Sequence, residues 1–301
     1  MAQRVNRGAD GPGRKPEWLK KALPGPAPLR KMEALLRDRS LHTVCESALC
    51  PNLGECFARG TATFLIMGDV CTRDCGFCGV TSGCPAGLDA DEPQNVADAV
   101  ARLELRHVVV TSVTRDDLAD GGAGHYVAIV RAIRSRTPDV TVEVLVPDFA
   151  GRMEHLDLVL GEAPEVFNHN VETVPRLYAL VRPQAVYERS LALLHRAAGR
   201  GRSLVKTGWM VGLGEREDEV RALLEEVAAR GVDMVTIGQY LRPSGRHLPV
   251  TEYVRPAVFA MYREWGEALG LQVHAAPFVR SSFQAGESFA EAKTRGGRES
   301  G

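Results

Sequence analysis

The chain has 301 residues, of which 45% are hydrophobic and 25% are charged. This composition is typical of a folded globular protein and excludes a disordered or collagen-like chain. The 37 basic and 38 acidic residues leave a formal net charge of −1, so we expect neither nucleic acid nor a membrane as a partner. The sequence also lacks an apolar run of the roughly 18 residues that a membrane-spanning helix needs.

Residues 1–40 are predicted to form a flexible basic N-terminal arm. They contain ten Lys or Arg against four acidic residues, together with many Gly and Pro. The arm lacks the apolar segment of a secretory signal. Because chain ends are commonly mobile, we interpret it as a solvated tail with incidental charge.

The seven cysteines are the most informative residues. Their odd number argues against a closed disulfide framework, and six of them lie between Cys45 and Cys78, while none follows Cys84. Such clustering indicates thiolate ligands of a metal or cluster. Free thiolates persist in reducing compartments, so the predicted location is cytoplasmic.

The clustered cysteines form two triplets. Cys45, Cys50 and Cys56 have the spacing C-x4-C-x5-C, and Cys71, Cys75 and Cys78 have the spacing C-x3-C-x2-C. Structural zinc sites take four ligands, whereas three thiolates and one missing ligand suit an iron–sulfur cubane with an open iron. A zinc site completed by a distant His remains the alternative. We interpret the seventh cysteine, Cys84, as a loop thiol without a role, although it could instead close the open iron.

From about residue 60, short apolar runs alternate with amphipathic stretches, which predicts repeated β/α units and a parallel sheet. The predicted strands are 63–67, 107–112, 140–146, 165–169, 203–211 and 234–238. The predicted helices are 95–105, 126–136, 187–198, 217–229 and 256–269. Six strands with crossover helices predict an α/β fold with an incomplete barrel.

Polar residues follow several predicted strands at their carboxyl ends, where barrels place active sites. The second cysteine triplet follows the first strand, and further polar sets occupy 111–117, 168–172 and 210–215. Together they predict a ligand pocket at one rim of the barrel. We expect Asn168 and Asn170 to face this pocket and interpret His169, between them, as structural.

The C-x3-C-x2-C triplet, with Phe77 before its last cysteine, resembles the radical S-adenosylmethionine (radical SAM) superfamily. The match extends further, because several segments together resemble the lipoyl synthase family. These segments are 45–78, 110–123, 167–178, 206–215, 238–244 and 278–283, and the resemblance covers about residues 40 to 287.

The resemblance implies a partial (β/α)6 TIM-type barrel in residues 63–275. Residues 41–62 would be an N-terminal extension carrying an auxiliary cluster, and residues 276–301 a short C-terminal segment with an Arg-Ser-Ser cluster ligand and a disordered tail. Two 4Fe-4S clusters are implied. Cys71, Cys75 and Cys78 would hold the S-adenosylmethionine cluster; the auxiliary cluster would be held by Cys45, Cys50, Cys56 and Ser282, with Ser281 as the alternative to Ser282. We expect the contacts to S-adenosylmethionine from Phe77, Ser112, Asn168, Asn170, Glu172, Arg182 and Gly212.

The implied activity is insertion of two sulfur atoms, drawn from the auxiliary cluster, at the sixth and eighth carbons of a protein-bound octanoyl-lysine. The implied partners are an octanoylated lipoyl-carrier protein (the glycine cleavage H protein or the lipoyl domain of a 2-oxoacid dehydrogenase E2) and a flavodoxin or ferredoxin reductant. We expect a monomer. Two other readings remain open: another radical sulfur-inserting enzyme, such as a methylthiotransferase or a biotin synthase relative, and a non-catalytic iron–sulfur or zinc protein.

Overall fold

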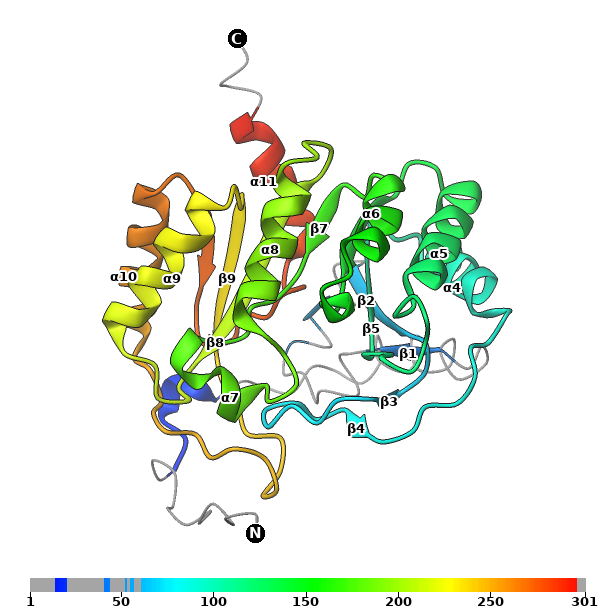
Figure 1. The fold of residues 1–301 in the computed structure, drawn as a ribbon. Helices are drawn as coiled ribbons and strands as arrows, with labels where there is room; N and C mark the ends of the chain where they lie inside the picture. The colour runs from blue at the N-terminus through cyan, green and yellow to red at the C-terminus, as the bar shows by residue number, and fades with distance from the viewer. Residues whose placement is uncertain (1–13, 21–40, 44–51, 53–54, 57–60, 297–301) are drawn as a thin grey trace.

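The structure, a computed structural model, describes residues 14–20, 41–43, 52, 55–56 and 61–296. Within them, eight strands form one sheet (Figure 1). In order across the sheet, the strands are β1 His42–Thr43, β2 Thr61–Ile66, β5 His107–Ser112, β6 Thr141–Leu145, β7 Val166–Asn168, β8 Leu204–Val211, β9 Met234–Gln239 and β10 Gln272–Ala275. A separate pair consists of β3 Val70–Cys71 and β4 Thr81–Ser82.

The strands from β2 to β10 run parallel, and only β1 is antiparallel to its neighbour. Helices connect the parallel strands, which gives six β/α units followed by a last strand. These helices are α4 Glu92–Arg102, α5 Ala123–Arg136, α6 Met153–Gly161, the short α7 Tyr178–Val181, α8 Tyr187–Ala198, α9 Glu217–Ala229 and α10 Pro256–Ala268. The predicted fold class, an incomplete α/β barrel, is confirmed.

Burial explains why these segments adopt these forms. All residues of β2 and of β9 are buried, as expected for parallel strands that are covered on both faces. The helices pack through one apolar stripe, as α8 does with Tyr187, Leu191 and Leu194. In the described part of the chain, no helix is long and apolar enough to cross a bilayer.

All six predicted strands are present, and so are the five predicted helices, with boundaries shifted by a few residues. The sequence analysis missed β10, whose four residues alternate between polar and apolar side chains. It also missed α6, α7 and the C-terminal helix α11, Ala285–Gly296. Much of the expected disordered tail is therefore helical; residues 297–301 lie outside the described residues.

Helix α11 covers the end of the sheet where the strands begin. Phe289 packs on His107, the first residue of β5, with ring centroids 6.1 Å apart. Figure 1 shows α11, in red, at the end of the molecule opposite to the β3–β4 pair, which is drawn in cyan. The second cysteine triplet thus lies at the opposite end of the barrel from α11, where the strands have their carboxyl ends.

A polar cluster lies on the face of the sheet that is opposite to α8. His169 contacts Ser190 of α8, so the neighbouring Asn168 points to the other face. There the buried Glu143 carboxylate accepts from Lys206 Nζ at 3.0 Å and from Asn168 Nδ2 at 3.2 Å. His107 Nε2 lies 3.3 Å from the same carboxylate.

Candidate active site

The second cysteine triplet follows β2 on a single loop. Cys71 ends β3, and a turn closed by a 3.0 Å hydrogen bond from Cys78 N to Cys75 O carries the other two thiols. All three side chains are partly buried. Burial raises the pKa of Cys78, with further contributions in the same direction from Cys75 and Cys71.

Hydrogen bonds hold this loop against the loop that follows β5. Thr72 donates to Thr114 O through its backbone N at 3.0 Å and through its hydroxyl at 2.9 Å. In return, Thr114 N donates to Cys71 Sγ at 3.3 Å. The position of Cys71 is therefore fixed by the neighbouring strand end.

Arg73, between the first two cysteines of the triplet, ties the loop to two strand ends. Its guanidinium binds Asp116 after β5 through two hydrogen bonds of 2.7 and 2.9 Å, and it binds Asp148 after β6 at 2.6 Å. Asp148 is fully buried and also accepts from Arg189 of α8 at 3.1 Å. The two parallel hydrogen bonds between the Arg73 guanidinium and the Asp116 carboxylate fix the orientation of Arg73 as well as its distance.

Gly76, between the second and third cysteines, is clamped on both sides. Its N–H donates to Val181 O and its carbonyl accepts from Leu248 N, both at 2.9 Å. A Cβ at this position would lie 2.9 Å from Leu248 Cγ. A side chain at position 76 would therefore displace Leu248 or the loop.

The thiols suit a soft metal centre. Burial raises the pKa of Cys78 to about 12 and also raises that of Cys75, although the charge of Arg182 opposes the shift at Cys75. Cys75 and Cys78 are thus protonated in the metal-free protein, and a metal must displace their protons to bind. Three sulfur donors on one loop match the preference of iron–sulfur clusters.

Among the described residues, no three His, Cys, Asp or Glu side chains are grouped to hold a single metal ion. Cys84 is exposed.

Asn170, Glu172 and Arg182 lie beside the cysteine loop. Asn170 Nδ2 donates to Glu172 Oε1 at 3.0 Å, and Arg182 Nη1 donates to Asn170 O at 3.0 Å. The charges of Glu172 and Arg182 both act on Cys75, and burial raises the pKa of Glu172. Arg182 Nε is buried and has no hydrogen-bond partner in the described part of the chain, so this site leaves a donor available to an anionic group.

The other predicted S-adenosylmethionine contacts are more dispersed. Phe77 is partly buried against the core. Asn168 Nδ2 donates to Glu143 Oε1, and Asn168 Oδ1 has no partner among the described residues. Ser112 Oγ accepts from Tyr126 OH of α5 at 3.0 Å, so this hydroxyl faces the helix layer and does not join Asn170, Glu172 and Arg182.

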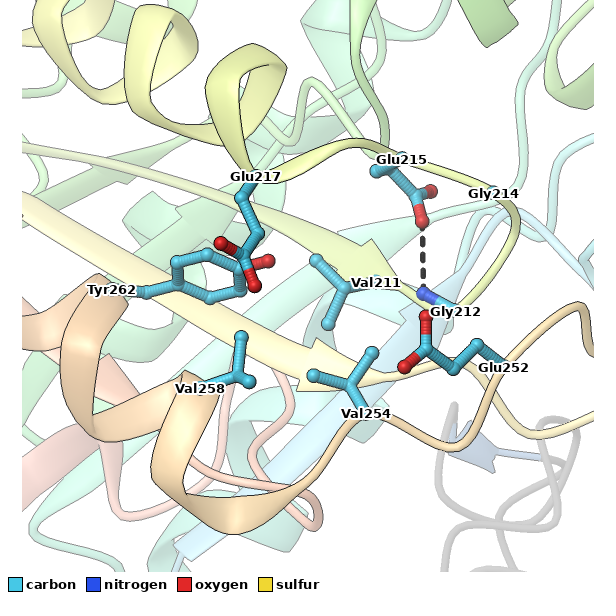
Figure 2. Close-up of a pocket in the computed structure, with 9 residues that line it drawn as sticks. All are labelled: Val211, Gly212, Gly214, Glu215, Glu217, Glu252, Val254, Val258 and Tyr262. Atoms are coloured by element: carbon cyan, nitrogen blue, oxygen red, sulfur yellow. Dashed lines mark hydrogen bonds between the residues drawn. The ribbon is translucent and has the colours of Figure 1, made fainter.

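Gly212, after β8, adopts a positive φ of 105°, where an added Cβ would meet Gln239 Nε2 at 2.2 Å. Its N–H donates to Glu215 Oε2 at 2.8 Å. This turn borders a cavity of about 50 Å³. Figure 2 shows the residues that line it: Val211, Gly212, Gly214, Glu215, Glu217, Glu252, Val254, Val258 and Tyr262. Glycine is needed here for backbone geometry.

His169 has the structural role that the sequence indicated. Its Nδ1 bonds Val146 O at 2.8 Å and its Nε2 bonds Ser190 Oγ at 2.9 Å. Burial lowers the pKa of His169 to about 4, so the ring is neutral near pH 7. It links β7 to α8.

The first triplet is described only in part, because Cys45 and Cys50 lie outside the described residues. Cys56 is partly buried, and its backbone N donates to Asn52 O at 3.0 Å. Asn52 Nδ2 in turn donates to Phe278 O at 2.6 Å. The segment of the first triplet therefore contacts the C-terminal segment that carries Ser281 and Ser282, 226 residues along the chain.

The sequence did not single out Arg73, Gly76 and Asp148 as residues that shape the site, whereas Asp116 belongs to the predicted polar set 111–117. An Arg between two predicted ligands is a usable signal. Its partners, however, lie 43 and 75 residues away, and no spacing rule connects them.

Comparisons with known proteins identify the family of this chain. A family model of the radical SAM superfamily matches residues 65–227. Lipoyl synthase from Chlorobaculum tepidum is 55% identical over 91% of this chain and 96% of its own, and that from Chlorobium chlorochromatii is 54% identical over 91% and 94%. The crystal structure of methylornithine synthase aligns with a TM-score of 0.52 at 12% identity, over 81% of this chain and 80% of its own, which supports the fold alone. On these similarities, this chain belongs to the lipoyl synthase family of the radical SAM superfamily.

Proposed function

We propose that this chain inserts two sulfur atoms at the sixth and eighth carbons of an octanoyl group linked to a lysine of a carrier protein. One observation carries the proposal: a loop with three thiols lies at the carboxyl ends of the strands, beside the buried Arg182 and the half-buried Glu172. The bonds to be broken are unactivated C–H bonds, so bound cofactors must carry the chemistry while the protein supplies position and electrostatics.

Cys71, Cys75 and Cys78 would hold one 4Fe-4S cluster together with S-adenosylmethionine. When bound, this pair supplies the 5′-deoxyadenosyl radical that removes hydrogen from the octanoyl chain. The buried Arg182, whose Nε lacks a partner among the described residues, would receive an anionic group of the cofactor. Next to it, Asn170 Nδ2 donates to Glu172 Oε1, and the backbone carbonyl of Asn170 accepts from Arg182 Nη1. Phe77, Ser112, Asn168 and Gly212 stay in our proposed contact set, although the hydroxyl of Ser112 already accepts a hydrogen bond from Tyr126.

We assign the auxiliary 4Fe-4S cluster, the source of the sulfur atoms, to Cys45, Cys50, Cys56 and Ser282. The hydrogen bond from Asn52 to Phe278 O supports this set, because it joins the first triplet to the C-terminal segment. Ser281 Oγ is bonded to Asn170 Nδ2 at 2.7 Å. Ser282 Oγ has no hydrogen-bond partner in the described part of the chain, so its hydroxyl is the more available of the two.

The acceptor in this proposal is a lipoyl-carrier protein, either the glycine cleavage H protein or the lipoyl domain of a 2-oxoacid dehydrogenase E2. A flavodoxin or ferredoxin would supply the electrons. Because six ligand thiolates require a reducing environment, we place the reaction in the cytoplasm, with the chain acting as a monomer.

Two cysteine variants test the proposed function. Reconstituted anaerobically, the parent chain should bind about eight irons, four for each cluster, and convert an octanoyl-lysine peptide to the lipoyl product. Cys50→Ala should still cleave S-adenosylmethionine to 5′-deoxyadenosine but transfer no sulfur. Cys75→Ala should lose both activities.

Iron, sulfide and zinc analysis separates the alternatives. About one zinc per parent chain and no 5′-deoxyadenosine would indicate a structural metal site and overturn the proposal. Loss of S-adenosylmethionine cleavage in a folded Cys50→Ala variant would contradict the division of labour between the two triplets. Turnover of a non-octanoylated acceptor would favour a different sulfur-inserting enzyme.

A further inference from the structure

The C-terminal segment 276–282, which we name the serine strap, packs directly on β9. Ala276 N donates to Ile237 O at 3.1 Å, and Gln239 N donates to Pro277 O at 3.2 Å. These two bonds flank Gly238. The strap then turns, with Val279 N donating to Ala276 O at 3.0 Å.

Gly238 lies at the point of closest approach. A Cβ built on this residue would lie 2.1 Å from Val279 O and 3.1 Å from Val279 C. Both are backbone atoms, so no change of side-chain rotamer relieves the contact. Any side chain at position 238 must displace the strap.

The other side of the strap is held by the loop after β7 and by the segment of the first triplet. Ser281 Oγ lies 2.7 Å from Asn170 Nδ2 and 2.9 Å from Asn170 Oδ1. Phe278 O accepts from Asn52, four residues before Cys56. The strap thus lies between β9, the loop after β7 and the segment of the first triplet.

We propose that Gly238 is a positioning residue for the auxiliary cluster. By lacking a side chain, it lets the strap lie deep enough against β9 for the hydrogen bond of Ser281 to Asn170 to form, and this depth sets where Ser282 stands relative to the first triplet. The inference rests on the proposed function, because it assumes that Ser282 completes a cluster on that triplet. Formation of the auxiliary cluster would then depend on Gly238, a residue outside the two cysteine triplets.

The test compares Gly238→Ala with Gly161→Ala, in the reconstituted full chain. Gly161 is a suitable control because an added Cβ there meets nothing within 4 Å. Gly238→Ala should bind about four irons, half of the parent value of about eight. It should cleave S-adenosylmethionine within about twofold of the parent rate but form no lipoyl product. Amide hydrogen exchange in 277–283 should become at least tenfold faster, whereas Gly161→Ala should match the parent in each measurement.

The outcomes separate the two proposals. A parent chain that binds only four irons contradicts the two-cluster function itself. If the parent binds about eight irons and folded Gly238→Ala also binds eight with unchanged exchange in 277–283, the role of Gly238 is overturned. Should Gly238→Ala fail to fold, Ser281→Ala provides the second test, because it removes the hydrogen bond to Asn170 without adding atoms. Amide hydrogen exchange in 277–283 should then become faster. Unchanged exchange would overturn the proposed position of the strap.

Discussion

Arg73 Nη2 donates to Asp148 Oδ1 at 2.6 Å, within a pair that is almost completely buried. Arg73 belongs to the loop of the second triplet, whereas Asp148 follows β6. The ion pair therefore fixes the thiols relative to the sheet, and Arg189 supports it from α8 with a hydrogen bond of 3.1 Å to the same carboxylate. Breaking one partner of such a buried pair leaves an uncompensated charge.

This pair predicts an acid-sensitive stability. Burial by itself would raise the pKa of Asp148, but the hydrogen bond and charge of Arg73 outweigh it and lower the pKa to about 2. A lowered carboxyl pKa stabilises the fold above the ordinary value of 3.8, and this stabilisation is lost as the pH falls towards 2. Between pH 5 and 2, the free energy of unfolding of the metal-free parent should fall by about 2 kcal/mol more than that of Asp148→Asn. Urea unfolding at several pH values measures this difference.

Asp157→Asn is the surface control. Its pairs with Arg196 and Arg200 are about half exposed on the arginine side, so solvent screens them and the pH profile should change less. Identical profiles for Asp148→Asn and the parent would contradict the role of the buried pair.

A second prediction concerns Gly76. In Gly76→Ala, the new Cβ would lie 2.9 Å from Leu248 Cγ and 3.0 Å from its Cδ1, and relief of this contact should shift the cysteine turn. We expect the rate of S-adenosylmethionine cleavage to fall about tenfold, equivalent to about 1.4 kcal/mol in the barrier. Adding Leu248→Ala should restore most of the rate, because it removes the atoms that clash.

Gly87→Ala is the matched control, since nothing lies within 4 Å of its added Cβ; its rate should equal that of the parent. A double variant no faster than Gly76→Ala alone would show that the clash with Leu248 is not what limits the loop.

Local pattern was sufficient to predict much of this protein. The cysteine triplet lies at the end of β2 as predicted, because both its spacing and the preceding apolar strand are local features of the sequence. Asn170, Glu172 and Arg182 do gather beside Cys75, since parallel strands bring their carboxyl ends to one rim. The helix Ala285–Gly296 was not predicted, although its Ala, Glu and Lys residues favour a helix; it packs on His107 at the end of the barrel where the strands begin.

Side-chain direction at strand ends was the weaker part of the prediction. Ser112 is the last residue of β5, and its hydroxyl is bonded to Tyr126 on the helix side. A shift of one residue reverses the face on which a strand side chain lies, and the sequence offered no marker of register at that point. Likewise Asn168 faces away from α8, as expected, but the partner that it meets there, Glu143, is set by the neighbouring strand.

The buried pair of Glu143 and Lys206 predicts strong coupling in stability. Both side chains are 1% exposed, and their charged atoms lie 3.0 Å apart. Glu143→Gln should lower the free energy of unfolding by about 3–5 kcal/mol, because Lys206 then lacks its counter-charge. Combining it with Lys206→Met should cost less than Glu143→Gln alone, which urea unfolding of the four proteins in a double-mutant cycle measures.

Glu162→Gln supplies the surface comparison. Its partner Arg131 is 70% exposed, so removal of that pair should change the free energy of unfolding by less than about 1 kcal/mol. If the double Glu143→Gln, Lys206→Met variant were as unstable as the sum of the single changes, the two charges would not be coupled.

The last prediction distinguishes the two serines of the strap. Ser281 Oγ is held by Asn170 at 2.7 Å, so Ser281→Ala should loosen the strap but leave a ligand for the auxiliary cluster. Ser282→Ala should remove that ligand and abolish sulfur insertion, while cleavage of S-adenosylmethionine continues. Ser282→Cys should keep about eight irons yet form product more slowly, because a thiolate holds iron more firmly than a hydroxyl oxygen does. Single-turnover mass spectrometry of an octanoyl-lysine peptide reads out each variant. Full product formation by Ser282→Ala, with none by Ser281→Ala, would reverse the assignment and make Ser281 the ligand.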